Sequence, residues 1–211
     1  MNMAQNYGVP VKNVLFDLGG VLLDWKPDRL YQKLIDDADS RKDFLTNICT
    51  MEWHARHDAG LSFAKNADEL ILQYPEYTDL IRAWGARWFD MFAGYIDGVP
   101  ALIDQLRAKD VPLFALSNMP GDPWEEMQIV FPYLTYFRDV VVSGHEKCIK
   151  PDPRIYQIAL ARMGNPEPQN VLFIDDSAKN IAAADALGFQ THLFKNACGL
   201  ETALIQFKLI G

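Results

Sequence analysis

The stretch VKNVLFDLGG, residues 11–20, joins a short apolar run to an aspartate and a pair of glycines. An apolar run of this length, rich in Val, Leu and Phe, is typical of a strand that is buried on both faces of a sheet. Asp17 ends the run, and Gly19 follows two positions later, where a second acid would give a carboxylate pair. The stretch therefore predicts a buried strand that carries one carboxylate at its carboxyl end.

Four further runs of the same kind occur along the chain: VPLFALS (111–117), DVVVS (139–143), NVLFIDD (170–176) and QTHLF (190–194). Helical patterns lie between them: VPALIDQLRAKD (99–110), PRIYQIALARMG (153–164) and AKNIAAADALG (178–188). Strands that alternate with helices favour βαβ units and a mostly parallel sheet. We therefore expect an α/β fold built on a parallel five-stranded sheet.

The alternation is interrupted once, by residues 25–94. This segment contains several helical patterns and no convincing strand. It is far too long for an ordinary connection between two elements. We therefore expect residues 25–94 to form an all-helical subdomain inserted after the first strand, with residues 1–24 and 95–211 forming the core. The many aromatic side chains of the insert are expected to form its packing core.

The composition excludes several classes of protein. Of the 211 residues, 49% are hydrophobic, and no apolar run approaches the roughly 20 residues that span a bilayer. The formal charge of −8 disfavours a nucleic-acid partner. Three cysteines without a CxxC pair are typical of reduced thiols, and the first 13 residues read as a short leader without a secretory signal pattern. We expect a cytoplasmic protein without a membrane or nucleic-acid partner, of unknown oligomeric state.

Polar side chains gather at the predicted strand ends. They are Asp17 after the first strand, Ser117 and Asn118 after the second, Lys150 in the loop after the third, and Asp175 and Asp176 after the fourth. Ligands of parallel sheets bind beyond the carboxyl ends of the strands. Any one of these residues has a structural explanation, because Asp and Ser are favoured at turns and helix caps. Their joint occurrence favours a functional site.

This set of side chains supports phosphoryl transfer. The Asp17 carboxylate can attack phosphorus and form an aspartyl-phosphate, which divides the hydrolysis into two easier steps. A Mg²⁺ ion between Asp17 and the Asp175–Asp176 pair would offset the repulsion between carboxylate and phosphate. Ser117, Asn118 and Lys150 would contact the substrate: Ser117 and the backbone N–H that follows it would bind the phosphoryl oxygens, and Lys150 would stabilise the transition state. We therefore predict a small-molecule phosphate ester as the substrate.

In these motifs the chain resembles the haloacid dehalogenase-like (HAD) hydrolase superfamily. FDLGGVLLDW, LSN, IKPDPRIY and FIDDSAKN resemble the four motifs of that family, in the family's order. The resemblance implies a Rossmann-like core and a helical cap that closes over the active site and selects the substrate. By motif position it implies a nucleophile, a phosphate-binding hydroxyl, a motif-three lysine and two magnesium-binding acids: Asp17, Ser117, Lys150, Asp175 and Asp176.

Gly19 departs from the family's pattern. Phosphatases of the family usually carry a second aspartate there, which protonates the leaving alkoxide and whose backbone carbonyl binds the metal. Gly19 retains the carbonyl but lacks the acid, a general acid–base contribution on the order of 10²- to 10⁴-fold. In EWHARHDAG, His54, His57 and Asp58 share one helical face, so His54 and His57 are candidate substrate contacts or proton carriers. A solvated polar face of a cap helix is the alternative.

Three functions follow, in order of preference. The first is a Mg²⁺-dependent phosphatase of a small phosphorylated metabolite, with sugar phosphates as one candidate class. The second is a non-catalytic or regulatory binding protein, which Gly19 motivates because a fold does not guarantee an activity. The third is a metal-independent 2-haloacid dehalogenase, which needs no acid for its leaving halide. The adjacent acids Asp175 and Asp176 argue against this third function, because two like charges in one pocket are costly without a cation.

Overall fold

A parallel five-stranded sheet forms the centre of the larger part of the molecule. The computed structural model describes residues 9–211, so most of the expected leader lies outside the described residues. The strands are β1 (Asn13–Phe16), β4 (Leu113–Ser117), β5 (Val140–Val142), β6 (Val171–Asp175) and β7 (Gln190–Leu193). Their order is β5-β4-β1-β6-β7, and every neighbouring pair is parallel. The expected α/β fold is confirmed.

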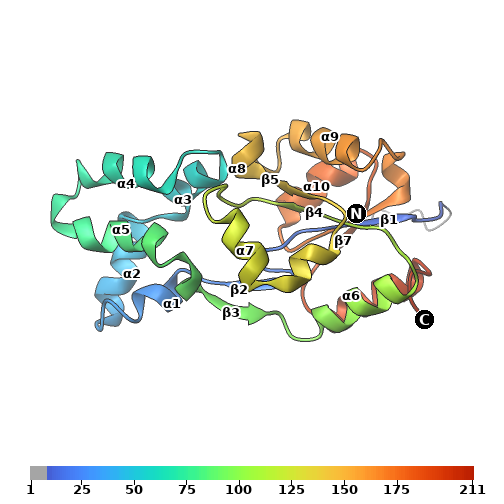
Figure 1. Cartoon of the computed structure of the whole chain (residues 1–211), viewed down its shortest axis with the longest axis horizontal. Helices are drawn as coiled ribbons and strands as arrows, with labels where there is room; N and C mark the ends of the chain where they lie inside the picture. The colour runs from blue at the N-terminus through green and yellow to red at the C-terminus, as the bar shows by residue number, and fades with distance from the viewer. Residues whose placement is uncertain (1–8) are drawn as a thin grey trace.

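Helices cover both faces of this sheet. Alternate residues of β1 point to opposite faces, so Val14 and Phe16 belong to one apolar cluster and Leu15 to another. The first cluster includes side chains of α6 (Val99–Ala108), α7 (Trp124–Val130) and α11 (Ala197–Gln206), and the second those of α9 (Pro153–Arg162) and α10 (Ala178–Ala186). Figure 1 shows α9 and α10 on one side of the sheet and α6 on the other. The strands are therefore apolar throughout because both faces are covered.

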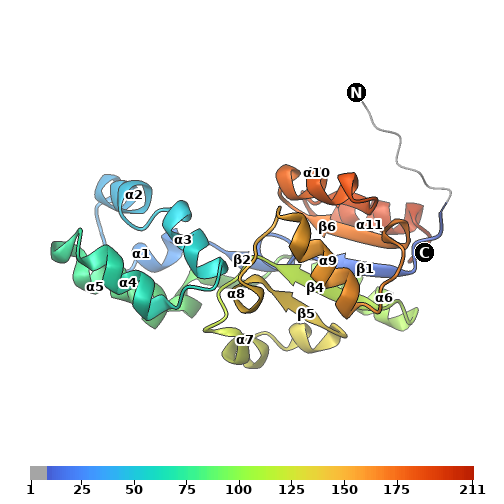
Figure 2. The same cartoon turned by 90° about the horizontal axis from the view of Figure 1, so that it is seen from above.

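The segment between β1 and α6 forms a separate group of helices, drawn on the left in Figures 1 and 2. They are α1 (Asp28–Tyr31), α2 (Ala38–Asn47), α3 (Met51–Asp58), α4 (Phe63–Ile71) and α5 (Thr78–Ala86). Asp37, Thr50 and Ser62 cap the starts of α2, α3 and α4, each accepting a backbone N–H with its side chain. We call this group the cap. Its interior is aromatic, as expected, with Tyr31 and Trp84 fully buried.

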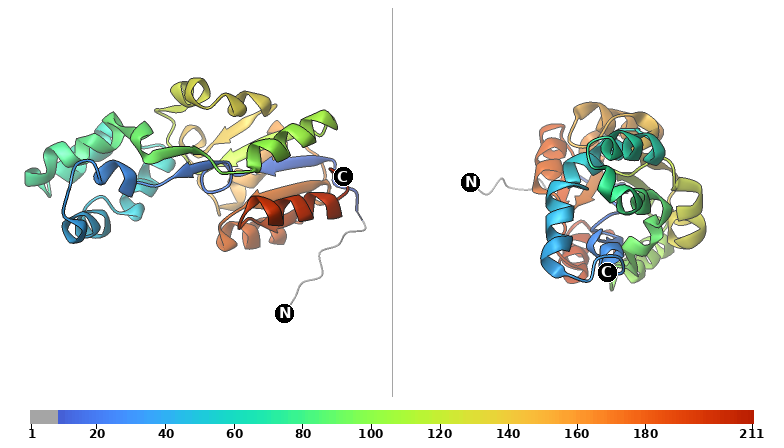
Figure 3. Two further views of the ribbon diagram at one scale, coloured as in Figure 1. Left: turned by 90° about the horizontal axis from the view of Figure 1, so that it is seen from below. Right: turned by 90° about the vertical axis from the view of Figure 1, so that its left-hand side faces the viewer.

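A short antiparallel ribbon joins the cap to the core. It consists of β2 (Leu23–Trp25) and β3 (Phe92–Tyr95). Figure 3 shows that the two strands lie where the chain leaves and re-enters the core. No strand was expected within residues 25–94, yet Trp25 and Phe92 pair with each other. Each strand is stabilised by a partner some 70 residues away, so local periodicity carried no signal for either of them.

The cap also contacts the core at α8 (Ser143–Glu146), which directly follows β5. The Ser143 hydroxyl donates a hydrogen bond of 2.7 Å to the backbone carbonyl of Asp58 at the end of α3. The same oxygen accepts from the backbone N–H of Met119, at 2.9 Å. One buried hydroxyl thus ties the cap helix α3 to two loops at the carboxyl edge of the sheet. Within residues 9–211, no helix is both long enough and apolar enough to cross a bilayer.

Candidate active site

Lys150 occupies the centre of the charged groups at the carboxyl edge of the sheet. Its ammonium nitrogen lies 2.9 Å from Oδ2 of Asp17 and 2.7 Å from Oδ2 of Asp175. It donates its third hydrogen bond to the Leu116 carbonyl, at 2.9 Å, so all three of its N–H donors are satisfied. Burial lowers the pKa of Lys150, but Asp17 and Asp175 outweigh it and raise that pKa above its ordinary value. The side chain therefore stays charged although it is buried.

Asn118 holds the backbone of Lys150 from the neighbouring loop. Its amide nitrogen donates to the Lys150 carbonyl at 3.0 Å, and its amide oxygen accepts from the Lys150 backbone N–H at 2.7 Å. Asn118 was predicted to contact substrate, and it does line the cavity described below. The paired hydrogen bonds show a further role, because they fix the loop that carries the ammonium.

Asp17 lies at the end of β1, buried and held in one orientation. Its Oδ1 accepts from the Leu18 backbone N–H at 2.6 Å, and its Oδ2 faces Lys150. Burial raises the pKa of Asp17 to about 7; Lys150 counteracts that rise, and the nearby charge of Asp175 adds to it. The carboxylate is thus poorly solvated and fixed in position, as a nucleophile needs to be.

Asp175 is fully buried at the end of β6, and protein groups satisfy both of its oxygens. Oδ1 accepts from the Ser177 backbone N–H at 2.8 Å, and Oδ2 accepts from Lys150. The Asn180 amide nitrogen lies 3.1 Å from each oxygen. A carboxylate offers about four lone-pair positions, so Asp175 has little capacity left for another ligand. Asn180 was not among the predicted site residues, although it is the last residue of the FIDDSAKN motif.

Asp176 follows directly and is exposed at the same strand end. Although the residue is exposed, partial desolvation of its carboxyl group raises the pKa of Asp176 above the ordinary value, and the charge of Asp175 raises it further. One oxygen from each of Asp17, Asp175 and Asp176 lies within 4.8 Å of the others. Three carboxylates this close form an oxygen donor set for a hard divalent cation, which would relieve their repulsion. The residues present therefore fit Mg²⁺, with Asp17 and Asp176 offering the less saturated oxygens.

The two glycines after Asp17 are not equivalent. Gly20 has a positive φ of +75°, and a Cβ added there would lie 2.2 Å from Oδ2 of Asp176. Only glycine fits this backbone conformation and this close approach without strain. A Cβ on Gly19 would meet nothing within 4 Å. Gly19 is the departure from the family's pattern, whereas Gly20 is the position where the positive φ and the approach of the Asp176 side chain disfavour any other residue.

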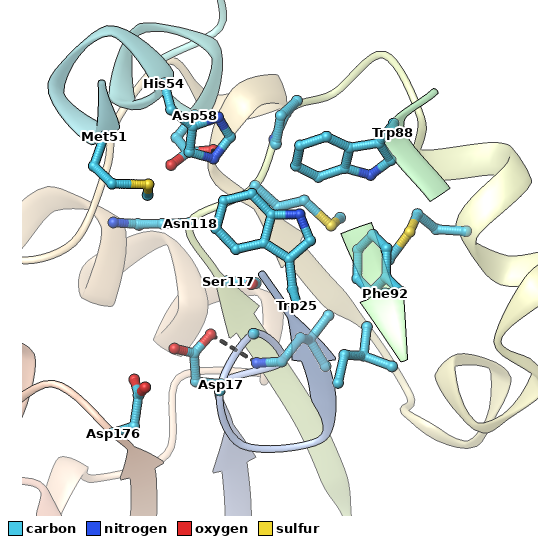
Figure 4. A pocket seen from close by; sticks show the side chains of 17 residues that line it. Asp17, Trp25, Met51, His54, Asp58, Trp88, Phe92, Ser117, Asn118 and Asp176 are labelled. Carbon is cyan, nitrogen blue, oxygen red and sulfur yellow. Dashed lines mark hydrogen bonds and ion pairs between the residues drawn. The ribbon is translucent and has the colours of Figure 1, made fainter. Parts of the chain in front are cut away.

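A cavity of about 300 Å³ lies between the core and the cap. The core contributes Asp17, Ser117, Asn118 and Asp176 to its wall, and Met51, His54 and Asp58 come from cap helix α3. Figure 4 shows the acids Asp17 and Asp176 on one side and the cap side chains on the opposite side. Most of the remaining wall is apolar: Leu18, Leu23, Trp25, Trp88, Phe92, Met119, Pro120 and Met127. Among the described residues, no lysine or arginine lines this cavity.

The two histidines of α3 lie in different surroundings. His54 lines the cavity and stacks against both Trp25 and Trp88, with ring centroids 5.0 and 5.6 Å away. Burial, with a smaller contribution from His57, lowers the pKa of His54 to about 3, so the ring is neutral at neutral pH. His57 does not line the cavity; it packs edge-on against Trp53 at 4.7 Å in the interior of the cap. Of the two candidate contacts, only His54 reaches the cavity.

Asp58 is the cap acid that reaches the cavity. Its Oδ1 lies 3.4 Å from Nε2 of His54, and its side chain is only 11% exposed. Burial raises the pKa of Asp58 to about 7, and Lys150 partly opposes that rise. The helical spacing placed Asp58 on the same face as the histidines but could not show which direction that face points.

Comparisons with known proteins agree with this architecture. The family model of haloacid dehalogenase-like hydrolases matches residues 11–188. A sesquiterpene phosphatase of Aspergillus oryzae is 23% identical over 84% of this chain and 86% of its own. A phosphorylated carbohydrates phosphatase of Thermotoga maritima is 25% identical over 84% of this chain and 82% of its own. The magnesium complex of a Bacteroides thetaiotaomicron HAD family enzyme superposes with a TM-score of 0.68, 24% identity and coverage of 89% and 95%.

The family match spans the cap, the core from β1 to α10 and the acids at the strand ends. Its extent confirms the resemblance stated from the four motifs. The chain belongs to the haloacid dehalogenase-like hydrolase family.

Proposed function

We propose that the protein is a Mg²⁺-dependent phosphatase that hydrolyses a small phosphate monoester through an aspartyl-phosphate. The observation that carries the proposal is the buried Asp17 carboxylate, held at the cavity wall beside a charged lysine and two further acids. Relatives named as phosphatases support it, as does the magnesium complex of the HAD family enzyme with the same fold.

In this mechanism Asp17 attacks phosphorus, and the bond to the leaving alcohol breaks. The Leu18 N–H occupies Oδ1 of Asp17, so the carboxylate is oriented before substrate arrives. Ser117 lines the cavity beside Asp17 and donates its hydroxyl to a phosphoryl oxygen. Lys150 lies behind the acids, where its charge holds Asp17 and Asp175 together and stabilises negative charge on the phosphoryl group.

Asp17, Asp176 and the backbone carbonyl of Gly19 would hold the metal ion, with Asp175 supporting the site from behind. This assignment follows from the saturation of Asp175 by Lys150 and Asn180. When bound, Mg²⁺ would neutralise charge between the carboxylates and the phosphate.

The cavity wall bears on the rest of the substrate, which we propose is selected by the cap. Because no lysine or arginine among the described residues lines the wall, a second phosphate or a carboxylate would find no opposite charge there. We therefore propose esters of uncharged alcohols. Neutral sugar phosphates remain one candidate class, and esters with an apolar alcohol match the tryptophan and methionine wall more closely.

The test is phosphate release from a panel of esters, with Mg²⁺ and with EDTA, for the wild type and Asp17→Asn. We expect Mg²⁺-dependent turnover that falls by about 10⁴-fold or more in Asp17→Asn, because the nucleophile is lost. Unchanged folding of the variant, measured by circular dichroism, is the control.

The two alternative functions give different results in the same assay. Halide release from a 2-haloacid in EDTA would replace the proposal with dehalogenase chemistry. Binding of Mg²⁺ and phosphate without turnover of any ester would favour a binding protein.

A further inference from the structure

We propose that Asp58, from the cap helix α3, protonates the leaving oxygen of the substrate, in place of the acid that Gly19 lacks. The inference rests on the proposed phosphatase function and names a catalytic residue for it. The proposed acid lies in the cap helix α3, whereas the acid that family phosphatases usually carry belongs to the loop after β1, at the position of Gly19.

The position of Asp58 carries the inference. Its side chain lines the cavity that Asp17 and Ser117 also line, and Figure 4 shows Asp58 on the cap side with Asp17 on the core side. A phosphate ester bound at Asp17 would direct its alcohol portion into this cavity, toward the cap. Asp58 and His54 are the two titratable side chains that the cap contributes to this wall among the described residues.

The Asp58 carboxyl has capacity for a substrate contact. Oδ1 has no hydrogen-bond partner among residues 9–211, although it is buried. Nε2 of His54 lies 3.4 Å from this oxygen, which is an ion-pair distance but a long hydrogen bond. A buried polar atom without a partner is costly, and a leaving oxygen that approached it would remove this cost.

The backbone of Asp58 is fixed to the core. Ser143 donates to the Asp58 carbonyl at 2.7 Å, and Thr50 caps the other end of α3 by accepting from the Trp53 N–H at 3.0 Å. The carboxyl-terminal end of the helix that carries the acid is therefore tied to the core, and its first turn is closed by a local cap. General acid catalysis requires such a fixed donor, because proton transfer depends steeply on distance.

The surroundings of Asp58 favour a transferable proton. Burial raises the pKa of Asp58 to about 7, and the charge of Lys150 partly opposes that rise. The His54 ring beside it is neutral at neutral pH and adds no charge. His54 itself is a poor acid for this step, because its pKa of about 3 leaves no proton on the imidazolium at neutral pH. Asp58 is thus the better proton donor of the two.

Asp17 forms a bond to phosphorus, the bond from phosphorus to the ester oxygen breaks, and the proton of Asp58 passes to that oxygen, which leaves as an alcohol. Asp58 is then a carboxylate. A water molecule next attacks the phosphorus of the aspartyl-phosphate, and the bond between phosphorus and the Asp17 carboxylate oxygen breaks. One proton of the water passes to Asp58, inorganic phosphate leaves, and Asp17 is again a carboxylate.

The test compares two esters in the Asp58→Asn variant. An alkyl phosphate has a poor leaving group that needs the proton, whereas p-nitrophenyl phosphate has a good one that does not. Because kcat/KM covers only the steps through departure of the alcohol, we expect Asp58→Asn to lower kcat/KM about 100-fold for the alkyl ester, and by about threefold or less for the aryl ester. Glu52→Gln, an exposed acid on the same helix, is the matched control and should change neither value.

A second variant adds a rescue. In the Asp58→Asn background, Gly19→Asp introduces an acid where a Cβ meets nothing within 4 Å, and we expect it to restore part of the lost activity on the alkyl ester. An equal loss on both esters would overturn the inference, because it would indicate a structural role for Asp58. Unchanged kcat/KM on both esters would also overturn it, because Asp58 would then take no part in the reaction. If the wild type released phosphate from no ester at all, the phosphatase proposal itself would fail.

Discussion

The polar groups on the two sides of the cavity differ in how they are satisfied. Directly behind the core wall, Lys150 has a partner for each of its three donors, and Asp175 has a partner for each oxygen. On the cap side, four buried polar atoms have no hydrogen-bond partner among the described residues: Nε1 of Trp25 and of Trp88, Nδ1 of His54 and Oδ1 of Asp58. The core side is therefore preorganised, whereas the cap side retains unused donors and acceptors.

This difference separates two tasks. A phosphoryl group is the same in every monoester, so the groups that bind it can be fixed by contacts within the protein. The alcohol differs from substrate to substrate, and unpartnered groups in an apolar wall favour a ligand that matches them and disfavour one that does not. Selectivity is thus expected to reside in the cap and catalytic power in the core.

The largest expected effect lies on the core side, at Lys150. Lys150→Met removes the charge between Asp17 and Asp175 and leaves two buried carboxylates facing each other. We expect kcat/KM to fall about 10³-fold or more for every active ester, since the lost group acts on the phosphoryl part that all of them share. Steady-state kinetics beside Lys109→Met, an exposed lysine at the end of α6, would measure it. A loss confined to one class of ester would contradict the proposed division between core and cap.

The next effect separates the two glycines after Asp17. Gly20→Ala places a Cβ against the Asp176 carboxylate, whereas Gly19→Ala points into open space. We expect Mg²⁺ affinity to weaken about 10- to 100-fold in Gly20→Ala and to stay close to wild type in Gly19→Ala. Titration calorimetry with Mg²⁺ alone measures both variants without any substrate. Equal affinities in the two variants would exclude Asp176 as a metal ligand held by this packing.

The smallest effect concerns the packing inside the cap, at His57. Burial lowers the pKa of His57 to about 4 despite the Leu61 carbonyl, which raises it, so the folded protein binds this proton less readily than the unfolded chain does. Stability contributed by the neutral ring is therefore present above the unfolded pKa of about 6.5 and is lost as pH falls toward about 4.

Between about pH 7.5 and about pH 5, this loss amounts to about 2 kcal/mol for one histidine. His57→Gln cannot take up the proton and should lose that much less stability than the wild type over the same interval. Urea unfolding of both proteins at the two pH values provides the measurement, and the buried carboxyls cancel in the difference. Identical pH dependence in the two proteins would show that His57 is solvated rather than part of the cap interior.

Much of the core was predictable from residue patterns. Buried strands such as NVLFIDD stand out because both of their faces are covered, so the apolar run is continuous and local. The acids that follow them meet because parallel strands end at one edge, as the proximity of Asp17, Asp175 and Asp176 shows. The β2–β3 ribbon was not predictable, since Trp25 and Phe92 are stabilised by pairing with each other rather than by their own neighbours.

Residue patterns were enough to predict the core strands and helices in their order along the chain, the gathering of acids and a lysine at one sheet edge, and the family to which those motifs belong. How individual side chains are used depended on the packing of distant segments. This packing buried His57 in the cap, placed Asp58 on the cavity wall opposite Asp17, and bonded Asp175 so fully that Asp176 is the more accessible acid. The physical reason is that periodicity is a property of one segment, whereas orientation and desolvation depend on what other segments pack against it.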